Sequence, residues 1–189
     1  MAWPIIVSNV SVPLLGAVDT AVVGHLDAAF YIGGVALGTL LFNYIYWGFG
    51  FLRMSTTGLT AQANGQHDTA ESRAILLRAL MLGGAIGVAL FLLSPLLKIG
   101  TFAAFEGTQT VESLAKGYFN ARIWGAPAYL MGLAVTGWML GTGKTGQMLA
   151  FQIVMNGTNA GLDAWFVAGL DWGPTGIGAG TAIAEWVAL

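Results

Sequence analysis

The sequence predicts an all-α protein that crosses a membrane several times, as a six-helix transmembrane bundle. Hydrophobic residues make up 56% of the 189 residues and charged residues only 8%, whereas about 25% of an ordinary soluble domain is charged. The mean hydropathy is +0.73. Long apolar runs, separated by short polar or glycine-rich breaks, follow one another along the whole chain. A bilayer, rather than water, is therefore the expected solvent for most of this surface.

Six apolar runs lie at about 3–25, 31–52, 74–99, 118–141, 148–170 and 175–189. Crossing a bilayer takes roughly 20 residues, so five of the runs predict full spans. The sixth stops at Leu189, short of that length, and we expect it to be a truncated helix. Hydrocarbon offers backbone amides no partner, and the alternating pattern of a barrel strand is absent, so each span is expected to be helical.

The first run lacks the basic flank and cleavage site of a signal peptide, which makes it the first expected spanning helix. Pro13 removes a backbone hydrogen bond in this run and permits a kink. Asp19 follows six residues later and is an ionisable group in an apolar segment, which is a functional candidate by default. We hypothesise that protonation of Asp19 biases a bend at Pro13, with a static kink as the alternative.

The second run passes into a polar stretch that continues the helix to about residue 64, beginning with Arg53. Two roles for Arg53 stay open, because its guanidinium can reach the membrane interface or pair with a carboxylate of the bundle. Aromatic residues such as Tyr44 and Trp47 are typical of an interfacial belt. Lining a cavity for flat, lipophilic cations is the alternative interpretation.

Basic residues in the short loops predict the orientation. Arg73 and Arg78 precede or open the third run, and Lys144 follows the fourth. The intervening loops hold acidic residues, namely Asp27, Glu106, Glu112 and Asp171. By the positive-inside rule the basic loops, and with them the N-terminus, are expected to be cytoplasmic. Lys98 and Lys116 lie on the other side and oppose this assignment.

The fifth run carries a polar face. Asn156 and Asn159 precede Asp163 by seven and four residues, which places all three on one side of a helix. A buried carboxylate beside an amide can carry a proton, because removal from water disfavours its charged form, or it can bind a hard cation such as Na⁺. Asp19 and Thr181 can add oxygens from the first and sixth helices. The alternative is simple interhelical adhesion, which contributes about 0.6 to 2 kcal/mol per contact.

Several classes of function are disfavoured by composition. The chain has no cysteine and only two histidines, which disfavours disulfides, thiolate metal sites and a metal cluster. It has no basic cluster for nucleic acid. The zinc-protease, serine-hydrolase and phosphate-loop motifs are absent, so neither an enzyme nor a cofactor is expected.

Three blocks of sequence resemble the multidrug and toxic compound extrusion (MATE) family, in particular its DinF-like branch. They are PLLGAVDTAVVGHLDAAFYIGGVALG, FLRMSTTGLTAQA and NAGLDAWFVAGLDWGPTGIGAGTAIAEW. The resemblance covers essentially the whole chain but only the N-terminal half of such a transporter, which has about twelve helices in two pseudo-symmetric bundles. A lone half is expected to be inactive.

The resemblance implies an antiporter that exports cationic, amphipathic drugs or dyes in exchange for H⁺ or Na⁺. Such a transporter would act among the lipids of the bacterial inner membrane, as a monomer when complete. The family's cation-coupling residues match Asp19, Asn159, Asp163 and Thr181, which are also the candidate Na⁺ ligands, with Asn156, Pro13 and Arg53 in supporting positions.

Two alternatives remain. A lipid-linked oligosaccharide flippase shares the paired helical bundles but is expected to have a more cationic cavity. A non-transporting membrane scaffold would use Asp19 and Asp163 only to hold helices together. The sequence does not separate H⁺ from Na⁺ coupling, because carboxylate, amide and hydroxyl groups suit either ion.

Overall fold

A computed structural model of the chain describes residues 29–104 and 108–189. The first expected span, with Pro13 and Asp19, lies outside the described residues. Within them the regular structure is entirely helical. The elements are α2 (Ala29–Trp47), α3 (Phe51–Gly65), α4 (Thr69–Leu92), α5 (Ser94–Ala104), α6 (Gln109–Arg122), the 3₁₀ segment η1 (Ile123–Gly125), α7 (Ala126–Gly141), α8 (Thr145–Ala164), the π-helical η2 (Trp165–Gly169) and α9 (Gly173–Ala188).

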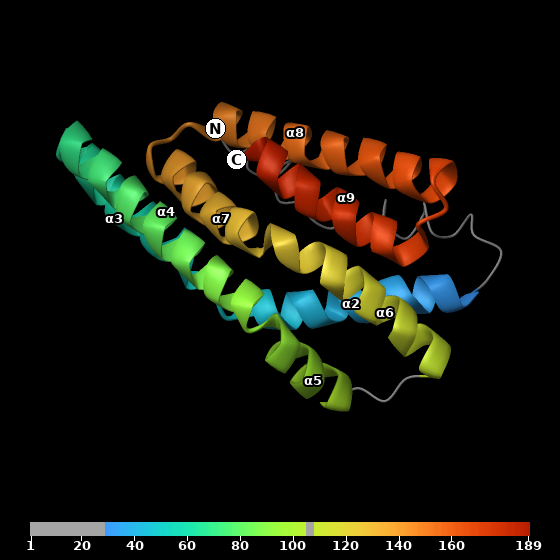
Figure 1. The fold of residues 1–189 in the computed structure, drawn as a ribbon. Helices are drawn as coiled ribbons and strands as arrows, with labels where there is room; N and C mark the ends of the chain where they lie inside the picture. The colour runs from blue at the N-terminus through green and yellow to red at the C-terminus, as the bar shows by residue number, and fades with distance from the viewer. Residues whose placement is uncertain (1–28, 105–107) are drawn as a thin grey trace.

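The long segment formed by α6, η1 and α7 runs through the middle of the bundle (Figure 1). The helix α2 packs on α6, and both α3 and α4 pack on α7. On the other side α9 packs on α6 and is covered in turn by α8. Helices α2, α3, α4 and α9 therefore all pack on the segment Gln109–Gly141.

Glycines set the closest helix crossings. At Gly38 an added Cβ would overlap the ring of Tyr118, where α2 crosses α6. At Gly87 it would overlap the backbone of Pro127, where α4 crosses α7. Lipid provides no hydrophobic force between helices, so association in a membrane depends on such close contacts.

The helix bounds differ from the apolar runs most clearly at three places. The second run breaks at residues 48–50, next to Gly48 and Gly50, so α2 and α3 are separate helices. Within the third run, α4 ends at Leu92 and a separate short helix, α5, begins at Ser94. The fourth span begins at Gln109 rather than near 118, because its first turns are polar and amphipathic. An ion pair of 2.9 Å between Lys116 and Glu112 stabilises those turns.

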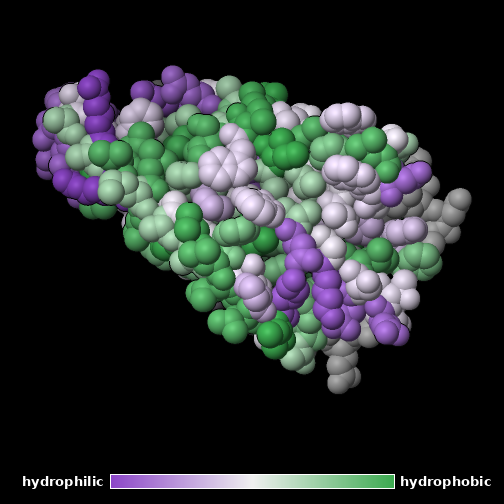
Figure 2. Space-filling model, viewed as in Figure 1, coloured by the Kyte–Doolittle hydropathy of each residue, from purple (hydrophilic) through white to green (hydrophobic). Residues whose placement is uncertain are grey.

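Within residues 29–104 and 108–189, three segments are long and apolar enough to cross a membrane, namely Ala29–Trp47, Thr69–Leu92 and Gln109–Gly141. Hydrophobic residues cover much of the visible surface, while hydrophilic ones gather at the end where α3 meets α4 and in a second group over the region of α5 and α6 (Figure 2). The carboxylate of Asp68 caps α4 at that end by accepting a 2.8 Å hydrogen bond from the backbone N–H of Glu71. The surface is that of a bundle with an apolar middle and a polar tip.

Candidate cation-coupling site

Helices α8 and α9 bring three of the predicted site residues together. Asn159 and Asp163 on α8 are fully buried, and Thr181 on α9 is 1% exposed. Asn159 and Asp163 are one helical turn apart, so both side chains face α9. Buried polar groups between two apolar helices are costly unless they bond to one another or to a ligand.

A hydrogen-bonded chain joins the two helices. The side-chain Nδ2 of Asn159 donates to Oγ1 of Thr181 at 3.1 Å. The Thr181 hydroxyl in turn donates to the carbonyl of Ile177 at 2.9 Å. The remaining polar atom of the amide, Oδ1 of Asn159, is buried and has no hydrogen-bond partner among the described residues. This carbonyl oxygen is therefore open to a cation or a protonated neighbour.

The carboxylate of Asp163 is held against the backbone of α9. A Cβ added at Gly180 would overlap Oδ1 of Asp163, so only glycine fits at this position without a shift. Gly180 directly precedes Thr181. The interface between α8 and α9 thus brings together the carboxylate of Asp163, the amide of Asn159 and the hydroxyl of Thr181.

The other predicted residues lie apart from this group or outside the described structure. Asn156 is half-buried on α8, one turn before Asn159. Arg53, on α3, forms no ion pair with any carboxylate of residues 29–104 and 108–189, which removes one of its two expected roles within that part of the chain. Asp19 and Pro13 belong to the undescribed segment.

Two features were missed by the sequence reasoning. The π-helical segment η2 begins two residues after Asp163, and π-helical turns are frequent at functional sites. No pattern in the sequence marks it. The second feature is a buried ion pair between Arg122 and Glu185, with 3.2 Å between the nitrogen and oxygen. Both are ionisable residues in apolar segments, and this property alone would have marked them as functional candidates.

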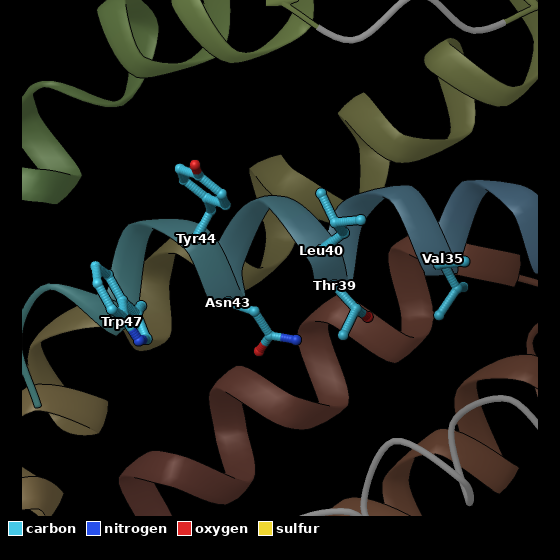
Figure 3. A pocket seen from close by; sticks show the side chains of 7 residues that line it. Val35, Thr39, Leu40, Asn43, Tyr44 and Trp47 are labelled. Carbon is cyan, nitrogen blue, oxygen red and sulfur yellow. The ribbon is translucent and has the colours of Figure 1, made fainter.

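A cavity of about 630 Å³ opens along one side of α2. It is lined by Val35, Ala36, Thr39, Leu40, Asn43, Tyr44 and Trp47. Figure 3 shows polar Thr39 and Asn43 projecting from one side of α2, while Leu40 and Tyr44 project from the other. The lining combines aromatic faces with a few polar groups, as small-molecule sites do.

The chain matches the family model described as MatE over residues 4–165. It is 39% identical, over 190 aligned residues, to the DNA damage-inducible protein F of Escherichia coli, covering 100% of this chain and 41% of that protein. It is 27% identical to the multidrug resistance protein NorM of Vibrio cholerae, covering 100% of this chain and 42% of that one.

Solved structures share the fold. A MOP superfamily transporter from Pyrococcus furiosus matches with a TM-score of 0.89 at 20% identity, covering 100% of this chain and 41% of that one. An outward-facing multidrug resistance MATE family transporter also gives 0.89 at 20% identity, covering 100% and 42%. The chain therefore spans about two fifths of the length of the relatives that it matches.

Proposed function

Because the chain belongs to the MatE family, whose members are transporters and not enzymes, we propose that it forms the N-terminal lobe of a secondary active multidrug antiporter. The complete transporter exports cationic, amphipathic compounds in exchange for H⁺ or Na⁺. Asn159, Asp163 and Thr181, together with Asp19, form its cation-coupling site.

One observation carries the coupling proposal. Oδ1 of Asn159 is a buried carbonyl oxygen without a hydrogen-bond partner among the described residues, and it lies one turn from the buried carboxylate of Asp163. A carbonyl and a carboxylate oxygen at one site are ligands that suit Na⁺. A proton on the carboxylate would instead supply a donor to such an acceptor. Either ion gives this oxygen a partner, which adhesion between helices alone does not.

The cavity beside α2 supports the drug-binding part of the proposal. Tyr44 and Trp47 present aromatic faces that attract flat organic cations. A flippase for pyrophosphate-linked sugars would need cationic groups that are free to bind the phosphates. The buried cation of the described spans, Arg122, is paired with Glu185. This pairing favours the exporter over the flippase.

The orientation follows from charge. Arg73 and Arg78 lie in or near the polar tip formed by α3 and α4, which we place in the cytoplasm together with the N-terminus. The outward end then holds the connection between α8 and α9, close to Asp163. The complete transporter is proposed to act as a monomer.

Ethidium efflux tests the proposal. The chain is joined to the C-terminal remainder of the E. coli relative and expressed in cells that lack their own exporters. Efflux is followed under imposed H⁺ and Na⁺ gradients for wild type, Asp163→Asn and the exposed-loop control Asp171→Asn. We expect wild type and the control to export dye and Asp163→Asn to lose export, with the effective gradient naming the ion.

Equal efflux by wild type and Asp163→Asn contradicts the coupling role. If no fusion exports dye, the purified chain supplies the measurement. Its melting temperature in detergent should rise with Na⁺ or depend on pH in wild type and lose that response in Asp163→Asn. A response that is unchanged in the variant also contradicts the proposal.

A further inference from the structure

The bundle contains a second buried carboxylate, Glu185, at a place separate from the coupling residues. Its Oε1 accepts from the guanidinium of Arg122 at 3.2 Å, and the two side chains are 4% and 11% exposed. The guanidinium also lies over the ring of Phe42, 5.3 Å from its centroid. Arg122 is thirteen residues beyond Gln109, about 20 Å along the axis of the 33-residue segment, so the pair lies away from both ends of that segment.

The ion pair sits at the break in the long central span. Arg122 is the last residue of α6, and the 3₁₀ segment η1 follows it directly. Gly125, which ends η1, lies so close to Oε2 of Glu185 that an added Cβ would overlap it. The indole N–H of Trp186 donates to the carbonyl of Trp124 at 3.0 Å. Two successive residues of α9 therefore hold η1 from one side, and a 3₁₀ break inside a span often marks a hinge.

Two polar atoms in this region lack partners. Oε2 of Glu185 and the hydroxyl of Tyr46 are buried and form no hydrogen bond within residues 29–104 and 108–189. The Tyr46 ring is stacked on that of Tyr129, with centroids 4.1 Å apart. Buried polar atoms without partners are rare in native proteins, and each points to a ligand, a proton or a water molecule that completes it.

We infer that Glu185 is a second proton-binding carboxylate of the lobe, with Arg122 as its built-in counter-ion. The proton binds at Oε2, which Arg122 leaves open, and converts the carboxylate into a neutral acid. Among the described residues, the other titratable groups in the region of Glu185 come from neighbouring helices. They are Arg122 and Tyr118 from α6, Tyr46 from α2, Tyr129 from α7 and, one to two turns away beside Gly180, Asp163 from α8. The segments η1 and η2 contribute none.

The number of available ligands selects a proton over a metal ion. Arg122 repels any added cation, so its charge does not discriminate between the two. A metal site needs several ligands, and the described residues contain no group of three His, Cys, Asp or Glu side chains. A proton needs only one open oxygen.

Binding of the proton has a structural consequence. It removes the negative charge that attracts Arg122, so one contact between the end of α6 and α9 is weakened beside η1. We expect the angle between α6 and α7 to change as a result. Proton occupancy of Glu185 is thus linked to the shape of the central span.

Infrared difference spectra between about pH 5 and pH 9 test the proton site on the purified chain in detergent. We expect a protonated-carboxyl band that is present in wild type and in Asp163→Asn and is lost in Glu185→Gln. Identical bands in wild type and Glu185→Gln overturn the proposal. If Glu185→Gln does not fold, the charge-neutral double variant Arg122→Met/Glu185→Leu replaces it. Loss of the band in this variant supports the proposal, and an unchanged band overturns it.

A second measurement follows the span itself. The chain has no cysteine, so Ser113→Cys near the start of α6 and Gln147→Cys in the first turn of α8, just after α7 ends, give two unique, exposed spin-label positions. The interspin distance should shift with pH in wild type and in Asp163→Asn and stay fixed in Glu185→Gln and in the double variant. A shift that persists without Glu185 overturns the link. Neither measurement involves transport, so failure here leaves the coupling proposal standing on its own test.

Discussion

The side-chain amide of Asn159 donates a hydrogen bond of 3.1 Å to the hydroxyl of Thr181, 22 residues further along the chain. The bond joins α8 to α9 at a level where both side chains are withdrawn from solvent. It fixes the orientation of the amide, and with it the direction of the open Oδ1 beside Asp163. Thr181 therefore orients a ligand oxygen that belongs to another helix.

Thr181→Val should destabilise the chain by about 1–3 kcal/mol, because it leaves Nδ2 of Asn159 buried without its acceptor. Thr181→Ser keeps the hydroxyl and should stay close to wild type. Denaturant unfolding of the purified chain in detergent measures both. A loss in Thr181→Ser with none in Thr181→Val would show that the methyl group of Thr181, and not its hydroxyl, matters.

Gly180→Ala should weaken the response of the melting temperature to Na⁺ or pH, because the new Cβ overlaps the position of the Asp163 carboxylate. Gly161→Ala on α8 is the matched control, since open space surrounds that position. Thermal melts across Na⁺ concentrations and pH values compare the two. An unchanged response in Gly180→Ala would mean that the carboxylate can move without loss of ion binding.

Gly87→Ala should destabilise the crossing of α4 and α7 by about 1–3 kcal/mol, because the Cβ meets the backbone of Pro127, which cannot rotate away. The control is Gly84→Ala on the same helix, whose Cβ would lie 3.4 Å from the flexible side chain of Met131. The unfolding free energies of both variants test whether Gly87 sets the crossing of α4 and α7. A similar loss at both positions would argue against a crossing set by Gly87.

Arg122→Met should cost about 3–5 kcal/mol at neutral pH, because it leaves the charge of Glu185 buried and uncompensated. The double variant Arg122→Met/Glu185→Leu removes both charges and should recover most of that loss. A double-mutant cycle of unfolding free energies gives the coupling between the two side chains. A double variant as unstable as the single one would show that packing, rather than charge, is lost.

Asp68→Ala should destabilise the N-terminus of α4 by about 1 kcal/mol through loss of its 2.8 Å capping bond. Arg78→Ala is the nearby control. It breaks an ion pair with Glu71 whose side chains are 69% and 45% exposed, so its effect should remain within about 0.5 kcal/mol. Hydrogen exchange of the first turn of α4 locates the change.

The polar face of α8 was predictable because helical spacing fixes which residues share a side. An apolar span in lipid is expected to be helical. Asn159 and Asp163 are four residues apart, which places them on the same face of such a helix. The π-helical turn after Asp163 was not predictable, since it depends on how α8 meets α9. Hydropathy also missed the pairing of Arg122 with Glu185, because the two residues are 63 positions apart and only the crossing of α6 and α9 joins them.

The central position of the segment Gln109–Gly141 has a consequence for biosynthesis. Helices α2, α3 and α4 leave the ribosome before it, yet among the described residues α2 packs mainly on α6, while α3 and α4 pack mainly on α7. We therefore expect these early helices to gain most of the contacts described here only when the fourth span is inserted. Nascent chains arrested before residue 109 should be exposed to quality-control proteases, and chains arrested after α7 should become resistant in a single step.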